Sequence, residues 1–224
     1  MKTIESTPAM TPPPLFERFI PSKAVLLDIA ERVLILMVYG QFAVRLMSVN
    51  VASLNIGSIL LMMSEAIPLF FVLFRKFSMN MSHDPFDWTV AIIGSSLPLL
   101  ILPQASRGPF IPVPVAEMLI MLGLCAQIAA KVSLGRSFGI VAANRGVEIS
   151  GPYRFVRHPM YLGYTMAHIG FLLLMPSVIN AILYGLAFFL QVVRLTREER
   201  VLNQDPAYRD FAARVRYRLV PGVF

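Results

Sequence analysis

Residues 160–196 read MYLGYTMAHIGFLLLMPSVINAILYGLAFFLQVVRLT, two apolar runs separated only by Met175-Pro176-Ser177. Each run approaches the roughly 20 residues that a helix needs to cross about 30 Å of hydrocarbon. Three residues between them leave room only for a tight turn. The stretch therefore predicts a membrane helical hairpin, with spans at 160–176 and 178–196, whose arms are antiparallel and in contact.

The sequence outside the hairpin is equally apolar. Hydrophobic residues make up 56% of the chain, charged residues 15%, and the mean hydropathy is +0.66, which is far more apolar than a soluble domain of this length. We therefore predict an all-α integral membrane protein with about six transmembrane helices. The first is the weakest, because Asp28, Glu31 and Arg32 lie in its opening turns and it could instead lie partly in the interface. The four further spans are 25–48, 54–74, 88–106 and 113–133.

Basic residues are distributed unevenly over the predicted loops. With six spans, 17 of the 20 Lys and Arg residues fall on one side of the membrane, and such an excess marks the cytosolic side. Both termini and the two longest polar segments, 131–157 and 194–224, are then expected to be cytosolic. We divide the chain into a disordered proline-rich tail (1–23), a four-helix membrane region (24–130) and a C-terminal core (131–224).

Several functional classes fit the sequence poorly. The net charge of +7 is explained by topology, since a nucleic-acid binder normally carries its basic face on a soluble module. The sequence has no GxGxxG, which disfavours a Rossmann-type nucleotide-binding domain. Cys125 is the only cysteine, and the three histidines, at 83, 158 and 168, have no metal-binding spacing. We predict no metal site.

The segment before the hairpin concentrates arginine, aromatic, glycine and proline residues and predicts a shaped, basic re-entry loop. Tyr153 and Tyr161 offer aromatic faces to an adenine ring or a sulfonium, a contact worth about 0.5–2 kcal/mol. Pro159 opens the following helix and leaves nearby N–H groups free for an anion. The alternative is an ordinary membrane-surface belt of tyrosines, with Arg154 and Arg157 as cytosolic anchors.

The helix beyond residue 190 carries a polar stripe. Gln191, Arg194 and Glu198 follow the i, i+3, i+7 spacing of one helix face. Arg194 and Glu198 are four residues apart and could form a simple surface ion pair. At the mouth of a membrane cavity, the same two groups could instead hold a ligand, the carboxylate binding an ammonium or hydroxyls and the guanidinium an anion.

Polar residues within the spans are costly in hydrocarbon and are candidates for function. For Glu65 we favour structural pairing with Arg45 or Arg32 over catalysis, and Glu117 lies near a span end. A further stripe in the fifth span either lines a tunnel or packs against another helix: Tyr161, Tyr164, Thr165 and His168.

Four motifs follow one another within residues 131–224: Leu134-Gly135-Arg136-Ser137-Phe138, Gly151-Pro152-Tyr153, Arg157-His158-Pro159-Met160-Tyr161-Leu162-Gly163, and Glu198-Glu199-Arg200-Val201-Leu202 followed by Tyr208. Taken in this order, they resemble the isoprenylcysteine carboxyl methyltransferase family. The sequence departs from that family after Leu202, where Asn203 to Ala207 lack the common Phe-Gly.

The resemblance implies a cytosolic pocket for S-adenosylmethionine, with a lipophilic substrate arriving from the membrane. Arg194 then matches the substrate-orienting arginine, for which we predict a catalytic role. The implied cofactor-binding residues are Arg145, Gly146, Val147, Glu148, Tyr153, His158, Pro159, Met160, Tyr161 and Glu198.

The predicted function is methyl transfer from S-adenosylmethionine to a lipophilic acceptor at the membrane–cytosol interface. The resemblance implies a carboxylate of the isoprenylcysteine type as the favoured acceptor, and such a nucleophile needs no general base. A lipid amine, a phenol or a small thiol is the alternative acceptor, and for one that needs a base His168 or Glu65 would be the candidate. Two rivals from other classes are an NADPH-dependent sterol-type membrane reductase and a non-catalytic lipid-binding membrane protein.

Overall fold

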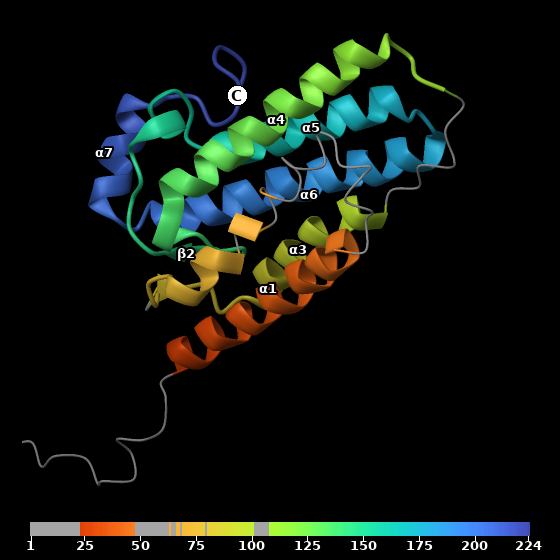
Figure 1. Ribbon diagram of the computed structural model, residues 1–224. Helices are drawn as coiled ribbons and strands as arrows, with labels where there is room; N and C mark the ends of the chain where they lie inside the picture. Colours follow the sequence, from red (N-terminus) through yellow and green to blue (C-terminus); the bar gives the residue numbers. More distant parts are fainter. Residues whose placement is uncertain (1–22, 48–62, 64–65, 68, 79, 101–107) are drawn as a thin grey trace, which may run out of the picture.

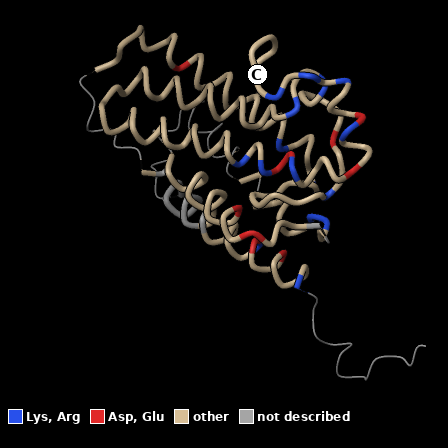
Figure 2. The backbone as a smooth tube through the Cα atoms, turned by 180° about the vertical axis from the view of Figure 1, so that it is seen from behind, with Lys and Arg blue, Asp and Glu red and all other residues tan. Residues whose placement is uncertain are grey.

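The chain forms a bundle of long helices (Figure 1), and the end where its charged residues gather is called the polar end (Figure 2). The computed structural model describes residues 23–47, 63, 66–67, 69–78, 80–100 and 108–224. The long helices are α1 (Lys23–Met47), α3 (Pro85–Ser96), α4 (Val113–Leu134), α5 (Pro159–Leu174) and α6 (Val178–Leu202), and the short α7 is Pro206–Arg214. The 3₁₀ turns are η3 (Leu97–Leu100), η5 (Gly135–Ser137) and η6 (Gly151–Arg154), and the two strands are β1 (Asn80–Met81) and β2 (Ala143–Asn144).

Local sequence sets the ends of these helices. The side chains of Asp84, Ser177 and Asp205 accept hydrogen bonds from the first backbone N–H groups of α3, α6 and α7, satisfying donors that a helix start leaves free. Pro159 occupies the first position of α5, where its missing N–H costs nothing. Gly135 ends α4 with φ +47°, a backbone conformation that favours glycine.

The predicted hairpin is formed by α5 and α6, which are joined through Met175-Pro176-Ser177. The closest packing of α5, however, is against α4. A Cβ added to Gly163 would lie 2.7 Å from the carbonyl oxygen of Gly123, and one added to Gly170 would lie 3.0 Å from the amide of Ile120. Small residues let the two antiparallel backbones nearly touch. We call this contact the α4–α5 seam.

Helix α3 packs on α6 at a greater separation than that of the seam. A Cβ on Gly94 would lie 3.4 Å from the Cβ of Leu190, which is ordinary side-chain contact. At the polar end, Arg197 of α6 pairs with Asp84 and Asp87 at the start of α3. These ion pairs fix the register of the two helices.

Among the described residues, two helical segments are long and apolar enough to cross a membrane: Val113–Ser137 and Val178–Leu202. Helix α5 is apolar but has only 16 residues. Both facts agree with an all-α membrane protein, while the number of six spans remains a prediction. Of the other predicted spans, 25–48 corresponds to α1 and 88–106 to α3 with η3, whereas most of 54–74 and the side chains of Glu65 and Arg45 lie outside the described residues.

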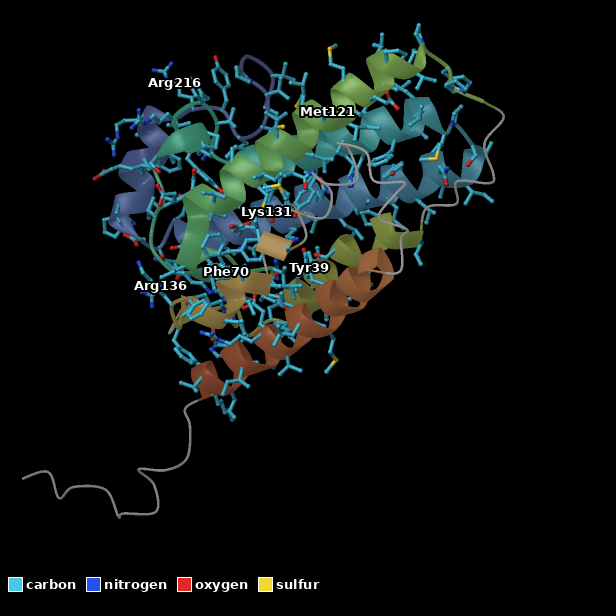
Figure 3. The ribbon with its side chains drawn as sticks, in the orientation of Figure 1. Tyr39, Phe70, Met121, Lys131, Arg136 and Arg216 are labelled. Carbon is cyan, nitrogen blue, oxygen red and sulfur yellow. The ribbon has the colours of Figure 1, made fainter. Side chains whose placement is uncertain are left out.

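Charged residues of the described chain gather at the end of the bundle that carries α7 (Figure 2). Arg136 and Arg216 lie at this end, whereas Lys131 lies between the helices (Figure 3) and is 0% exposed. The opposite end is almost free of charge, as expected where helices enter hydrocarbon. At the polar end, β1 and β2 form one small antiparallel pair, Asn80 opposite Asn144 and Met81 opposite Ala143.

Candidate functional site

A cavity with about 570 Å³ of empty space, part of it open to solvent, lies at the polar end of the bundle. Its wall is built from three parts of the chain: the segment 134–148 that leaves α4, the segment 153–161 that enters α5, and the ends of α6 and α7. The lining residues are Leu134, Ser137, Ala143, Arg145, Gly146, Val147, Glu148, Tyr153, Arg157, His158, Met160, Tyr161, Glu198, Leu202, Tyr208 and Phe211.

The structure brings most of the sequence-predicted cofactor residues to this cavity. Pro159 is buried in the first turn of α5 and does not line the wall, and Arg194 lies one helical turn before Glu198, outside the lining set. The predicted residues that line it are Arg145, Gly146, Val147, Glu148, Tyr153, His158, Met160, Tyr161 and Glu198.

The segment carrying Arg145 to Glu148 is held in place from both sides. Asn144 Oδ1 accepts the Gly146 amide at 3.0 Å, and Asn144 Nδ2 donates to Asp205 Oδ2 at 2.8 Å. Ser137 Oγ donates to the Arg145 carbonyl at 3.1 Å. Gly146 has φ +106°, a conformation open to glycine and strained for other residues. Side-chain hydrogen bonds therefore hold this part of the cavity wall in place.

The guanidinium of Arg145 faces away from solvent and binds Glu31 of α1. Only 6% of Arg145 is exposed, and its Nε is buried without a hydrogen-bond partner among the described residues. Sequence reasoning assigned this arginine to the cofactor alone. In the structure it lines the cavity and also belongs to a buried ionic cluster with α1.

The start of α5 presents His158, Met160 and Tyr161 to the cavity. His158 Nε2 lies 3.2 Å from Glu199 Oε1. The amides of Met160 and Tyr161 lie in the first helical turn, where N–H groups have no acceptor within the helix. These donors make the N-terminus of α5 suitable for binding a negatively charged ligand group.

The buried phenol of Tyr153 forms another part of the wall. Burial raises the pKa of Tyr153 well above 10.0, and the nearby carboxylates of Glu198 and Glu148 raise it further. The ring is therefore neutral at physiological pH. It can offer an aromatic face or an O–H donor but cannot act as a base.

Glu198 and Arg194 both contact Tyr161. The Tyr161 hydroxyl donates to Glu198 Oε2 at 2.9 Å, and the Arg194 guanidinium carbon lies 5.4 Å from the Tyr161 ring centre. Arg194 donates to Ser95 of α3 at 3.2 Å, and between these described residues the simple Arg194–Glu198 ion pair allowed by the sequence is not formed. Arg194 Nε is buried and has no partner within the described part of the chain.

Glu199 plays a different part from its neighbour. Glu199 is 3% exposed, and its carboxylate forms an ion pair with Arg157 at 3.0 Å and accepts hydrogen bonds from Tyr208 at 3.2 Å and Arg218 at 2.8 Å, in addition to facing His158. It thus ties the segment before α5 to α7 and to the C-terminal segment. Sequence reasoning ranked Glu199 below Glu198 for ligand binding and did not find this bracing role.

The polar stripe of α5 is a stack of rings inside the bundle. Tyr161, Tyr164 and His168 follow one another, and His168 stacks on Tyr184 of α6 with ring centres 4.8 Å apart. Lys131 Nζ lies 5.3 Å from the Tyr164 ring centre. For His168 the structure shows packing between the hairpin arms, which was one of the two readings of the sequence.

Other wall residues were not assigned to the cavity from the sequence. Leu134 and Leu202 belong to the motifs but were given no role, whereas Ala143 and Phe211 lie outside the motifs and had no signal. Within the described residues, no group of three or more His, Cys, Asp or Glu side chains is arranged to hold a metal ion.

Residues 115–208 match the family model described as phospholipid methyltransferase. The match begins in α4 and ends in α7, and it contains every residue of the cavity wall except Phe211. The resemblance to isoprenylcysteine carboxyl methyltransferases is confirmed at the level of this membrane methyltransferase family. No curated protein matches the chain.

Proposed function

We propose that the chain methylates a lipophilic acceptor at the cytosolic face of a membrane, with S-adenosylmethionine as donor. The premise is that residues 115–208 match the phospholipid methyltransferase family model, which indicates a methyltransferase. The observation that carries the proposal is the cavity, into which the cofactor-type residues of 145–161 and Glu198 converge from separate segments.

The residues of the cavity fit the groups of S-adenosylmethionine. Glu198 offers a carboxylate to its ammonium or ribose hydroxyls. The first-turn amides of Met160 and Tyr161 suit its carboxylate. The rings of Tyr153 and Tyr161 suit its adenine and sulfonium. When bound, the cofactor supplies a methyl group attached to a positively charged sulfur.

The chain's own contribution is to align the acceptor and exclude water. Methyl transfer to an anion neutralises charge, so a dry site favours it, and correct alignment can supply about 7–11 kcal/mol of the barrier. Arg194 has a buried Nε without a partner in the described chain, and its planar fork suits a carboxylate or phosphate oxygen. We assign it the role of orienting the acceptor.

A carboxylate of the isoprenylcysteine type is the favoured acceptor. It attacks as the anion and needs no general base. The phenol of Tyr153 is held neutral, and His158 is engaged with Glu199, so neither is placed as a free base. These features support an acceptor that is already ionised.

A phospholipid amine is the second candidate, favoured by the description of the matching family. An ammonium group has no lone pair and must lose a proton before it accepts a methyl group. The phosphate of such a lipid would suit Arg194 as well as a carboxylate does. The two acceptors therefore differ in the bond formed rather than in the anion bound.

A labelled-methyl assay distinguishes these acceptors. The full chain in lipid nanodiscs is incubated with methyl-labelled S-adenosylmethionine and either a prenylated cysteine with a free carboxylate or a mixture of aminophospholipids. Mild base releases volatile methanol from a methyl ester and leaves an N-methyl group in place. Glu198→Ala serves as the inactive control. Absence of label on either acceptor, together with thermal stabilisation by NADPH and none by S-adenosylmethionine, would establish the reductase alternative instead.

The membrane arrangement is part of the proposal. Six spans put both termini and the cavity in the cytosol, with 1–23 as a tail, 24–130 as a membrane region and 131–224 as the methyltransferase core. The charge distribution of Figure 2 supports this orientation. Labelling of single cysteines placed at residues 2 and 222 of a Cys125→Ser chain tests it: both must react from the cytosolic side only.

A further inference from the structure

Helix α1 lies outside the segment 115–208, yet two of its carboxylates are buried in the molecule. Asp28 and Glu31 are both 0% exposed. Buried carboxylates are costly unless paired, and here Arg32, Arg75 and Arg145 surround them. Arg145 comes from the cavity wall, so this buried cluster joins α1 to the candidate site.

Glu31 divides its two oxygens between the backbone and the side chains of its neighbours. Oε1 accepts the amides of Ile140 at 2.7 Å and Val141 at 2.8 Å. Oε2 binds Arg145 and lies 2.9 Å from Arg75. Three of these four donors therefore belong to the stretch 140–145, which runs directly into the wall residues Gly146 to Glu148.

The space around this contact is filled. A Cβ on Gly139 would lie 2.3 Å from Arg145 Nη1 and 3.0 Å from Glu31 Oε1. Farther along, Asn144 is fixed by pairing with Asn80 and by Asp205. Residues 140–148 are thus held at two points. Glu31 of α1 binds the beginning of this stretch, and Asp205 at the start of α7 binds Asn144 near its middle.

We infer that Glu31 is a positioning residue for the donor site: its carboxylate sets the course of residues 140–148 and thereby the cavity wall formed by Arg145, Gly146, Val147 and Glu148. The inference rests on the proposed function, since the wall is assigned to S-adenosylmethionine there. It extends the site to a helix that the family match does not reach.

The variant Glu31→Gln tests the inference. It keeps the size of the side chain but turns one acceptor oxygen into an NH₂ donor that meets only other donors. The Kd for S-adenosylmethionine, measured by calorimetry, is expected to rise on the order of tenfold. The KM for the donor rises with it, while kcat at saturating donor is retained. Simple loss of folded protein would lower the number of binding sites and kcat and leave Kd and KM unchanged.

Asp28→Asn is the matched control. Asp28 lies one turn earlier on α1, is equally buried, and shares Arg75 and, at 3.6 Å, Arg145 with Glu31. The amides of 140 and 141, however, bond to Glu31 and not to Asp28. It is expected to lower the melting temperature in the same way and leave the donor Kd at the wild-type value. An equal rise of Kd in both variants, or no rise in Glu31→Gln, would overturn the inference.

Amide hydrogen exchange without ligand separates this inference from the proposed function. The amides of Ile140 and Val141 are expected to exchange slowly in the wild type and in Asp28→Asn, and faster in Glu31→Gln. Unchanged exchange rejects positioning by Glu31, whereas a wild-type chain that binds no S-adenosylmethionine rejects the donor assignment. If Glu31→Gln fails to fold, Gly139→Ala disturbs the same contact, and wild-type donor affinity with wild-type exchange in that variant would reject the inference.

Discussion

Glu198 and Glu199 are consecutive in α6 but contact different neighbours. Glu198 accepts a hydrogen bond from the Tyr161 hydroxyl at the cavity wall, whereas the buried Glu199 pairs with Arg157 and accepts hydrogen bonds from Tyr208 and Arg218. Adjacent residues of a helix differ in direction by about 100°. One carboxylate is therefore available to a ligand and the other is consumed in holding the fold together. The two should respond differently to the same substitution.

Glu199→Gln is expected to lower stability by about 3 kcal/mol, because removing one partner leaves buried cationic groups uncompensated. Thermal unfolding in detergent measures the change. Arg200→Ala provides the control, since Arg200 is exposed on the same helix turn. A melting temperature for Glu199→Gln equal to that of Arg200→Ala would contradict the bracing role of Glu199.

Glu198→Ala and Arg194→Ala are expected to separate donor binding from turnover. Glu198→Ala abolishes measurable binding of S-adenosylmethionine in calorimetry. Arg194→Ala retains donor affinity and lowers kcat about a hundredfold, because the acceptor is no longer aligned. Unchanged donor affinity in Glu198→Ala would refute the assignment of its carboxylate to the cofactor.

Gly163→Ala tests the α4–α5 seam. The new methyl group would lie 2.7 Å from the Gly123 carbonyl oxygen and 2.8 Å from the Gln127 amide, and such overpacking costs about 1–3 kcal/mol. Gly185→Ala is the same substitution on α6 with nothing within 4 Å, and alanine there is expected to add about 0.5–1 kcal/mol through helix propensity. Melting curves with shifts of the same sign for both variants would argue against the seam.

Burial of the Tyr153 phenol is expected to make the folded chain less stable at high pH. Its folded-state pKa lies well above 10.0 because of burial. Below about pH 10 the phenol is neutral in both the folded and the unfolded chain. Above that pH the unfolded chain ionises first, so stability falls by up to about 1.4 kcal/mol per pH unit for this group. Denaturant unfolding measures the free energy of unfolding from pH 8 to 11, which should decline less steeply for Tyr153→Phe than for the wild type. Parallel declines in the two proteins would disprove the contribution of Tyr153.

The sequence was most informative where chemistry and spacing coincide within one segment. The Arg157 to Gly163 motif and the turn at Met175-Pro176-Ser177 predicted the start of α5 and the hairpin, because helix starts and tight turns are decided by adjacent residues. The pairing of α5 with α4 was not predicted. Gly123, Gly163 and Gly170 are small residues of the kind found where helices pack closely, but their presence in the sequence does not indicate which helix packs against which.

Contacts between segments that are distant in the sequence could not be predicted from the spacing of residues. Asp28 and Glu31 were treated as a weakness of the first span, whereas the structure buries both against arginines from elsewhere in the chain. A charge in an apolar helix has the same local signature whether it reaches water or a partner. Likewise, Glu199 differs from Glu198 only through residues of α7 and the C-terminal segment.

The α4–α5 seam also bears on how the proposed lipophilic acceptor would reach the cavity. Where Gly163 and Gly170 hold two backbones at contact distance along the helices, no gap wide enough for an acyl or prenyl chain exists, and parting the helices would break the tightest packing that the described bundle has. Under the proposed function, the hydrocarbon tail of the acceptor would therefore enter along a flank of α5 other than the seam. The glycines close the side of α5 that faces α4.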